Sequence, residues 1–269
     1  MPEGHTIHRL ARDHRRLFGG APVSVSSPQG RFTGGAALLD GAALVRTDAH
    51  GKHLFHGFGG TARTPERWLH VHLGLYGKFS TGAAPAPVPV GQVRMRLVGA
   101  EHYADLRGPI ACEVLTPADK AALHARLGAD PLRADADPSA AWARIARSRT
   151  SIGQLLMDQS VVAGVGNVYR AEVLFRHGVD PHRAGRDLDR AVWDAIWADL
   201  VGLLRAGVRA GRIVTTHREH RDRRSGTPSR EDATYTYRRT GLPCRVCGTP
   251  VRTADMATRN LYWCPTCQR

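Results

Sequence analysis

Ser151-Ile-Gly-Gln-Leu-Leu-Met-Asp-Gln-Ser-Val-Val-Ala-Gly-Val-Gly-Asn-Val-Tyr-Arg-Ala-Glu172 is the stretch that decides how the second half of this chain folds. Apolar residues at helical spacing predict two short helices, joined by a glycine turn, with Asn167 at the start of the second helix. Gly164 and Gly166 let backbone amides approach an anion, and a helix N-terminus adds partial positive charge, so the turn suits a phosphate group. An N-cap role for Asn167 is the alternative. A dinucleotide fingerprint is excluded, because the third glycine is missing and the turn follows a helix.

Helical periodicity continues on both sides of this stretch. It predicts helices over residues 139–147, 152–159, 168–177 and 188–210. Residues 215–230 are polar, charged and rich in turn formers, so we expect a mobile basic loop there.

The first half of the chain has a different pattern. Residues 5–18 place apolar side chains on one helical face, and two glycines end that helix. From there to about Pro117 the apolar residues alternate with polar ones, which predicts an antiparallel sheet. A further helix begins at Thr116-Pro117, and residues 128–133 read as the linker out of this part. We therefore expect an α+β protein.

The charge of the chain indicates its partner. It contains 38 Lys and Arg residues against 24 Asp and Glu residues, a formal net charge of +14. Such an excess fits a polyanion, and nucleic acid is favoured over a membrane because no apolar run approaches the roughly 18 residues of a spanning helix. The N-terminus has no apolar signal-peptide core either, so we expect a cytoplasmic protein.

Four of the five cysteines lie near the C-terminus, as two C-x-x-C pairs. Cys244 and Cys247 form the first pair, and Cys264 and Cys267 form the second. This spacing predicts a structural zinc ion bound by four thiolates, and a ribbon this short has little core without a metal. Disulfide bonds are the competing interpretation. Cys112 stands alone in an apolar stretch and is expected to be a small buried hydrophobe.

The N-terminus suggests covalent chemistry. Removal of Met1 would leave the secondary amine of Pro2 beside the carboxylic acid of Glu3. A terminal amine titrates near 8, so roughly a tenth of it is neutral and nucleophilic at pH 7. The adduct of proline with an aldehyde is an iminium that stays cationic and withdraws electrons from the neighbouring carbon. The alternative is that Pro2 merely permits methionine removal.

These motifs together resemble one known family. Pro-Glu-Gly-His at residues 2–5, Gly-Lys-His at 51–53, Gly-Val-Gly-Asn at 164–167 and the four cysteines follow one another as in the formamidopyrimidine-DNA glycosylase and endonuclease VIII family. The resemblance covers essentially the whole chain, and the tracts Gly-Lys-His-Leu-Phe-His and Leu-Tyr-Gly look most like the actinobacterial endonuclease VIII subgroup.

The resemblance implies an architecture. It implies a catalytic β-sandwich domain flanked by helices at residues 1–129, and a helix-two-turn-helix domain with the basic loop at 130–236. A zinc finger built as a β-hairpin ribbon would occupy residues 237–269.

The resemblance also implies a function and its catalytic residues. The expected activity is that of a bifunctional DNA glycosylase and AP lyase of base excision repair, acting on damaged double-stranded DNA as a monomer. Pro2 corresponds to the family's nucleophile and Glu3 to its neighbouring acid, while Glu172 matches a glutamate near the proline amine. For Glu172, an ordinary helix acid is the alternative. The strand would be cleaved by β,δ-elimination.

Five further residues correspond to DNA contacts of the family, and the first of them, Lys52, is also counted with the expected catalytic residues. Lys52 matches the β-hairpin lysine, Asn167 the phosphate-binding asparagine and Arg259 the zinc-finger arginine. Leu75 and Tyr76 match the residues that fill the space left by a flipped nucleotide, with ordinary strand core as the alternative.

The substrate base follows from the same turn. The Leu-Tyr pair, and the departure of residues 105–109 from an Arg-Phe-Gly type of sequence, favour oxidised pyrimidines over 8-oxoguanine. Two alternatives stay open at this point: a formamidopyrimidine/8-oxoguanine glycosylase of the same family, and a zinc-ribbon protein that binds damaged DNA without catalysis. Single-stranded or bubble DNA also stays open as a substrate. A second metal site at His70 and His72 is not expected, since no carboxylate or cysteine completes it in the sequence nearby.

Overall fold

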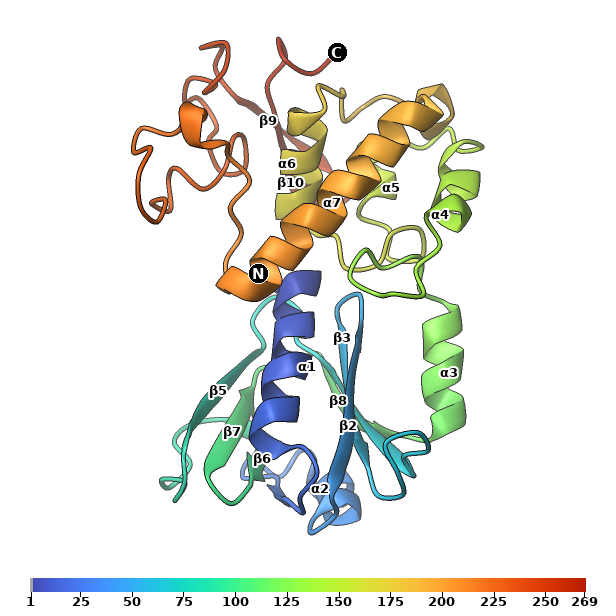
Figure 1. The fold of residues 1–269 in the computed structure, drawn as a ribbon, viewed down its shortest axis with the longest axis vertical. Coiled ribbons are helices and arrows are strands. Elements are labelled where there is room, and N and C mark those ends of the chain that lie inside the picture. The colour runs from blue at the N-terminus through green and yellow to red at the C-terminus, as the bar shows by residue number, and fades with distance from the viewer. Residues whose placement is uncertain (1) are drawn as a thin grey trace. The chain divides into compact units, whose positions relative to one another are not determined.

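The computed structural model describes residues 2–269. Met1, whose removal the sequence predicts, lies outside the described residues. The chain divides into two compact units, Met1–Arg126 and Leu127–Arg269, each with its own hydrophobic core (Figure 1). The predicted division at 129/130 and 236/237 stays a prediction.

The first unit combines eight strands with three helices. In chain order its elements are α1 (Gly4–Phe18), β1 (Ser24–Ser26), α2 (Thr33–Leu39), β2 (Leu44–His50), β3 (His53–Phe58), β4 (Arg67–His72), β5 (Lys78–Ala83), β6 (Val93–Val98), β7 (His102–Arg107), β8 (Ala111–Leu115) and α3 (Pro117–Ala125).

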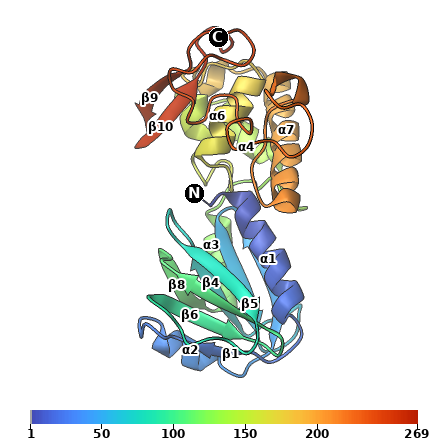
Figure 2. The same cartoon turned by 90° about the vertical axis from the view of Figure 1, so that its left-hand side faces the viewer.

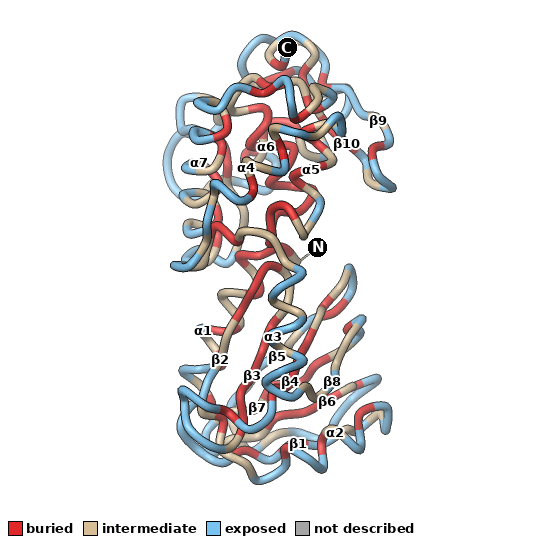
Figure 3. The backbone as a smooth tube through the Cα atoms, turned by 90° about the vertical axis from the view of Figure 1, so that its right-hand side faces the viewer, coloured by how far each residue is buried: buried red, intermediate tan, exposed pale blue. Residues whose placement is uncertain are grey.

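The eight strands form two four-stranded sheets, in the orders β1-β6-β7-β5 and β2-β3-β4-β8. All of their pairings are antiparallel, as the alternating pattern predicts. Side chains from both sheets meet in one core together with residues of α1 and α2, so the unit is a β-sandwich (Figure 2). Figure 3 shows the buried stretches along the strands.

Helix α1 is amphipathic and packs against β2 and β3. It buries Ile7, Ala11 and Phe18, and its arginines lie largely on the other face. The helix starts at Gly4, one residue before the predicted position, and ends at Phe18 as predicted. Because α1 is fixed along its length, the residues at its first turn have a defined place in the unit.

A histidine of this helix is buried against a histidine of β3. His14 of α1 and His56 of β3 have no exposed surface, and the His14 Nδ1 atom lies 3.0 Å from His56 Nε2. The rings stack, and His14 also meets Phe79 edge to face. Burial lowers the pKa of His14 to about 4 and that of His56 well below its ordinary value. Both rings are therefore neutral in the folded protein near pH 7.

We expect this pair to make the unit sensitive to acid. The unfolded chain takes up protons near pH 6.5 whereas the folded pair resists them, so its stabilising contribution is complete above pH 6.5 and declines as the pH falls towards 4. Because the unfolded chain binds this proton at pH 5, His14 alone should lower the free energy of unfolding by about 2 kcal/mol at pH 5 relative to pH 7.5. Denaturant titrations at the two pH values measure this difference.

The double variant His14→Leu, His56→Leu supplies the comparison, since it removes both titrating groups and keeps the site apolar. Its stability should fall less between pH 7.5 and 5 than that of the wild type, whereas His102→Gln on β7 should behave as the wild type. An unchanged pH dependence in the double variant would contradict the assignment.

The second unit is largely helical. Its elements are α4 (Pro138–Ile145), α5 (Ile152–Leu155), α6 (Asn167–Arg176), η1 (Gly185–Asp187), α7 (Arg190–Ala210), η2 (Arg218–His220), β9 (Arg252–Met256) and β10 (Arg259–Trp263). Helices α4 to α7 enclose one apolar core around Trp193, and β9 and β10 form an antiparallel hairpin.

The predicted and observed bounds differ by one or two residues at α1, α4, α6 and α7, and the larger differences concern α5, α2 and residues 215–230. Helix α5 is a single turn ending at Leu155, because residues 156–166 form successive turns instead. Helix α2 was not predicted, since a seven-residue segment with two glycines carries a weak helical signal. Apart from the short helix η2, residues 215–230 are irregular, as expected, and the segment is held at its base, where the Thr215 amide donates to the Ala233 carbonyl at 2.9 Å.

Among the helices of residues 2–269, none combines the length and the apolar character that a membrane crossing requires.

Candidate functional site

Pro2 and Glu3 stand at the start of α1. Glu3 is the N-cap residue, its carbonyl oxygen accepts the Thr6 amide at 2.9 Å, and its side chain is fully buried. Pro2 precedes it and is half-buried. The positive end of a helix dipole disfavours a protonated amine, which favours the nucleophilic form of a terminal amine at this place. The Pro2 nitrogen and a buried carboxyl group are thus adjacent in the chain at the start of one helix.

The next residue is also part of this terminus. His5 is buried, and burial together with the charge of Arg9 lowers its pKa to about 4. His5 is therefore neutral near pH 7 and adds no positive charge beside Pro2.

Lys52 lies in the tight turn between β2 and β3. His50 and His53 pair across the hairpin, and Gly51 takes a φ of 59°, which glycine adopts without strain. Lys52 is therefore a turn residue and does not belong to either strand. The short turn gives its backbone a fixed position.

Leu75 and Tyr76 form the exposed tip of the turn between β4 and β5. Leu75 is 43% exposed and Tyr76 is 86% exposed, so neither is strand core. Ile110, which the sequence analysis missed, is 73% exposed and packs on Gly74 so closely that a Cβ there would lie 2.3 Å from its Cδ1. The glycine at position 74 was a signal in the sequence, because a glycine lets another side chain, here that of Ile110, pack closely against the backbone. These three side chains form an apolar tip.

Within the second unit, Asn167 contacts the residue that follows Arg259 in the chain. The N-cap of α6 is Gly166, so Asn167 does not have the N-cap role. Its Nδ2 atom instead donates to the carbonyl oxygen of Asn260 at 3.0 Å, and its Oδ1 atom accepts a short hydrogen bond from Arg170. Asn260 directly follows Arg259 on β10. The glycine turn and the ribbon hairpin are thus joined at the two predicted phosphate contacts.

The tip of that hairpin is strained. Ala257 and Thr258 have φ values of 53° and 60°, although neither is glycine, and Arg259 follows immediately. Non-glycine residues in this region cost on the order of 1–3 kcal/mol each and tend to mark functional sites. The hairpin also approaches α5 closely at Gly153, where a Cβ would lie 2.8 Å from the Met256 sulfur.

The Glu172 side chain is buried among hydrogen-bond donors. Its Oε1 atom accepts the Thr236 and Tyr237 amides, both at 2.9 Å, and the Thr236 hydroxyl at 3.2 Å. Its Oε2 atom accepts the Tyr235 amide at 2.6 Å and a short bond from the Thr215 hydroxyl. A carboxylate offers about four lone-pair sites, so this set fills it. Glu172 thereby fixes both ends of the segment between residues 215 and 237.

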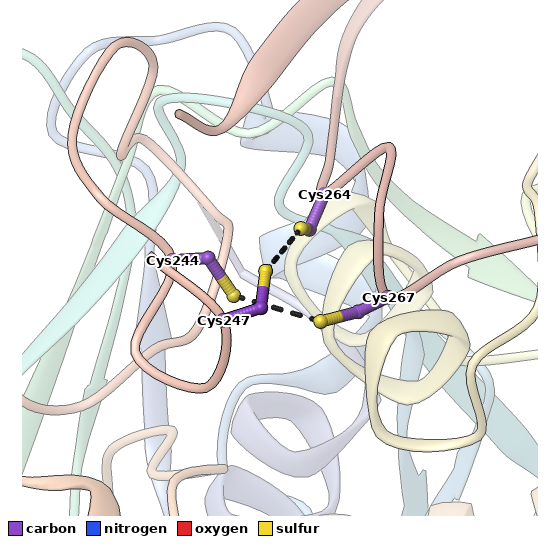
Figure 4. A group of neighbouring side chains, drawn as sticks. All are labelled: Cys244, Cys247, Cys264 and Cys267. Atoms are coloured by element: carbon purple, nitrogen blue, oxygen red, sulfur yellow. Dashed lines mark hydrogen bonds between the residues drawn. The ribbon is translucent and has the colours of Figure 1, made fainter. Parts of the chain in front are cut away.

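The four C-terminal cysteines converge (Figure 4). The Cys244 and Cys267 sulfurs lie 3.9 Å apart, those of Cys247 and Cys264 lie 3.4 Å apart, and all four lie within 4.8 Å of one another. A tetrahedral zinc ion with zinc–sulfur bonds of about 2.3 Å separates its sulfurs by roughly 3.8 Å. The four thiolates therefore fit one structural zinc ion.

The remaining cysteine and histidines differ from this cluster. Burial raises the pKa of the Cys112 thiol to about 12, and the residue packs against the sandwich core, although it is partly buried and not fully buried as predicted. Within residues 2–269, the four cysteines are the one group of three or more His, Cys, Asp or Glu side chains arranged to hold a metal ion.

Three protein families match the chain and together cover most of it. Residues 1–112 match the formamidopyrimidine-DNA glycosylase N-terminal domain, residues 127–219 match the formamidopyrimidine-DNA glycosylase H2TH domain, and residues 241–269 match the zinc finger found in FPG and IleRS. The N-terminal β-sandwich, the helix-two-turn-helix part and the four-cysteine hairpin are therefore those of this group.

Individual relatives agree. The chain is 56% identical to endonuclease 8 1 of Mycobacterium tuberculosis, over all of both chains. It is 30% identical to a formamidopyrimidine-DNA glycosylase of Parasynechococcus marenigrum, covering 100% of this chain and 99% of the relative. The fold matches that of Lactococcus lactis Fpg in its complex with DNA containing an abasic site, with a TM-score of 0.81, 20% identity and 99% of each chain covered.

Proposed function

The chain belongs to the formamidopyrimidine-DNA glycosylase and endonuclease VIII family of bifunctional glycosylases and AP lyases, and from this premise we propose that it removes oxidised pyrimidines from DNA through its N-terminal proline. The observation that carries the proposal is the Pro2–Glu3 pair, with Glu3 buried at the start of α1, in a chain 56% identical over its full length to an endonuclease 8.

The proposed chemistry begins at the Pro2 nitrogen. It attacks C1′ of a nucleotide turned out of the duplex, a bond forms from nitrogen to carbon, and the bond from C1′ to the base breaks. The base departs with the electron pair and takes up a proton, and Glu3 serves as the acid–base group for this proton transfer. The sugar ring opens to leave an iminium at C1′, which acidifies the hydrogens on C2′.

Strand cleavage follows from that acidity. Loss of a C2′ proton expels the 3′ phosphate by β-elimination, and a second elimination expels the 5′ phosphate. The result is a one-nucleotide gap bounded by phosphates. The iminium has no proton on nitrogen to lose, so it stays an electron sink through both steps.

Lys52, Asn167 and Arg259 bind the DNA backbone around the lesion. A lysine in a tight turn and an arginine at a hairpin tip offer charge-assisted hydrogen bonds to phosphate. Support comes from the turn at Lys52 and from the hydrogen bond that joins Asn167 to the residue after Arg259. Binding should weaken as salt rises, because each neutralised phosphate releases counterions.

Glu172 acts on the reaction through the segment that it holds. Its carboxylate accepts hydrogen bonds from Thr215 and from residues 235–237, so it orders the chain around the basic loop. Any proton transfer at Pro2 is accordingly assigned to Glu3 first.

Leu75 and Tyr76 fill the space left by the flipped nucleotide. Their exposure side by side at the tip of a turn supports this role, because neighbouring exposed apolar side chains tend to mark an interaction site. The Leu-Tyr pair is also the basis for choosing oxidised pyrimidines over 8-oxoguanine. The partner is damaged double-stranded DNA, bound by a monomer in the bacterial cytoplasm.

A panel of single-lesion duplexes tests the choice of base. We expect faster single-turnover cleavage of duplexes containing thymine glycol, dihydrouracil or 5-hydroxyuracil than of one containing 8-oxoguanine opposite cytosine. Single-stranded and bubble versions of the same oligonucleotides serve as parallel substrates. Preference for 8-oxoguanine would assign the chain to the other branch, and binding with no cleavage of any substrate would favour the non-catalytic alternative.

A further inference from the structure

A carboxylate and two imidazoles form a hydrogen-bonded row across three neighbouring strands of the first unit. The Glu113 Oε1 atom on β8 lies 2.9 Å from His70 Nδ1 on β4, and His70 Nε2 lies 2.9 Å from His53 Nδ1 on β3. Glu113 and His70 are directly paired in the sheet register. We name Glu113, His70 and His53 the carboxylate–histidine row.

With an ionised carboxylate and two neutral rings, one arrangement of protons fits these distances. An ionised carboxylate only accepts hydrogen bonds, so His70 must carry its proton on Nδ1 and donate it to Glu113. The Nε2 atom of neutral His70 is then an acceptor, which requires His53 to carry its proton on Nδ1. Burial lowers the pKa of His53 to about 3, with neighbouring histidines adding to the effect, and burial also lowers the pKa of His70. Both rings are therefore neutral.

The row has one exposed end and one buried interior. The Glu113 side chain is 54% exposed, whereas that of His70 is 4% exposed. Helix α3 lies over the neighbouring part of this sheet face, where His124 meets the rings of His50 and Phe55. Replacement of Glu113 thus changes the end of the row with little change to the core, which makes the row accessible to experiment.

The inner end of the row stands between two turns assigned to DNA. His53 directly follows the turn that carries Lys52. The ring of His53 also packs against that of His72, with centroids 4.8 Å apart, and His72 Nδ1 accepts the amide of Gly74 at 3.2 Å. Gly74 begins the turn that exposes Leu75 and Tyr76. One ring therefore touches the supports of both turns.

We propose that Glu113 is a positioning residue that acts through His70 to fix the ring of His53, and so holds the Lys52 turn and the Leu75–Tyr76 turn in the arrangement needed for turnover on DNA. The inference rests on the proposed function, since it assigns a task to those turns. His53 is fixed as a neutral ring with a defined tautomer, so it orients the turn without placing a second cation beside Lys52.

Two variants of Glu113 separate this role from a general structural one. Glu113→Ala removes the acceptor, whereas Glu113→Gln keeps an oxygen that can accept the His70 proton. Glu101→Ala removes an exposed acid elsewhere in the same unit and is the matched control. The readout is the single-turnover rate of strand cleavage on a duplex with an abasic site, at protein concentrations that saturate the DNA.

Glu113→Ala should lower that rate about tenfold, the order expected when a hydrogen bond to a charged group is lost. Glu113→Gln should keep most of the rate, and Glu101→Ala should match the wild type. Long-range 1H–15N spectra should show His70 and His53 protonated on Nδ1 in the wild type and in Glu113→Gln. In Glu113→Ala the same nitrogens should show mixed tautomers.

Three results would overturn the proposal: equal rates for Glu113→Ala and Glu101→Ala, an equal loss for Glu113→Gln and Glu113→Ala, or protonation of the two rings on Nε2 in the wild type. A wild type that binds but does not cleave DNA would instead reject the proposed function, and the spectra would still report on the row by themselves. The two failures are therefore distinguishable.

Discussion

Protein in which Pro2 is preceded by Met1, or by a short N-terminal extension, should form no borohydride-trapped complex with DNA. Its cleavage of lesion-containing duplex should be slower by on the order of 10³-fold or more, as expected when a covalent nucleophile is removed. In the extended chain the Pro2 nitrogen is part of an amide, so its electron pair is delocalised and cannot add to C1′. Trapping with borohydride and single-turnover gel assays measure the two effects.

A protease-removable extension provides the control within one preparation. Cleavage that exposes Pro2 should restore both trapping and turnover, while DNA affinity measured before and after removal should change little. The chain contains only three lysines, Lys52, Lys78 and Lys120, and Lys120 is paired with Asp48 at 2.7 Å. If the extended protein traps as well as the processed one, the nucleophile is one of these lysines or the terminal amine of the extension, and the assignment of Pro2 is wrong.

Features that depend on neighbouring residues were predictable from the sequence. The spacing of the four cysteines predicts a metal site, and in the structure their sulfurs lie within 4.8 Å of one another. The α1 helix follows from one apolar face ended by glycines. The antiparallel strands of the first unit follow from alternation, because a period of two can bury only one face of each strand, whereas the sandwich was expected only from the family resemblance. These predictions needed no knowledge of which strands pair.

Features that depend on register were not predictable. Nothing in the sequence says that His70 stands opposite Glu113, since this needs the pairing of β4 with β8. The same limit applies to Asn167, whose partner is the carbonyl of Asn260, and to Glu172, whose donors lie some 40 to 65 positions away. Ile110 shows the limit for packing, because its contact with Gly74 arises from two separate turns.

Removal of zinc, or the substitution Cys264→Ser, should unfold the ribbon and weaken binding to damaged DNA by at least about a hundredfold. Structural zinc contributes apparent binding energies of roughly 10–16 kcal/mol in small domains, and this ribbon takes part in only two small apolar clusters, one of which itself contains Cys244 and Cys264. Unfolding of the ribbon displaces Arg259 and also frees the side chain of Asn167, because the ribbon supplies the Asn260 carbonyl to which Asn167 donates. Two phosphate contacts worth about 1.5–3 kcal/mol each then fail together.

The measurement is metal content by a colorimetric chelator, followed by fluorescence anisotropy with a labelled abasic-site duplex at one fixed salt concentration. Cys112→Ser is the matched control, since that thiol belongs to the sandwich core, and it should keep one zinc ion and its DNA affinity. The histidines beneath α1 belong to the other unit, so the Cys264→Ser protein should keep the pH dependence of the first unit's unfolding. Retention of zinc by Cys264→Ser, or tight DNA binding without zinc, would show that the ribbon does not hold these two contacts in place.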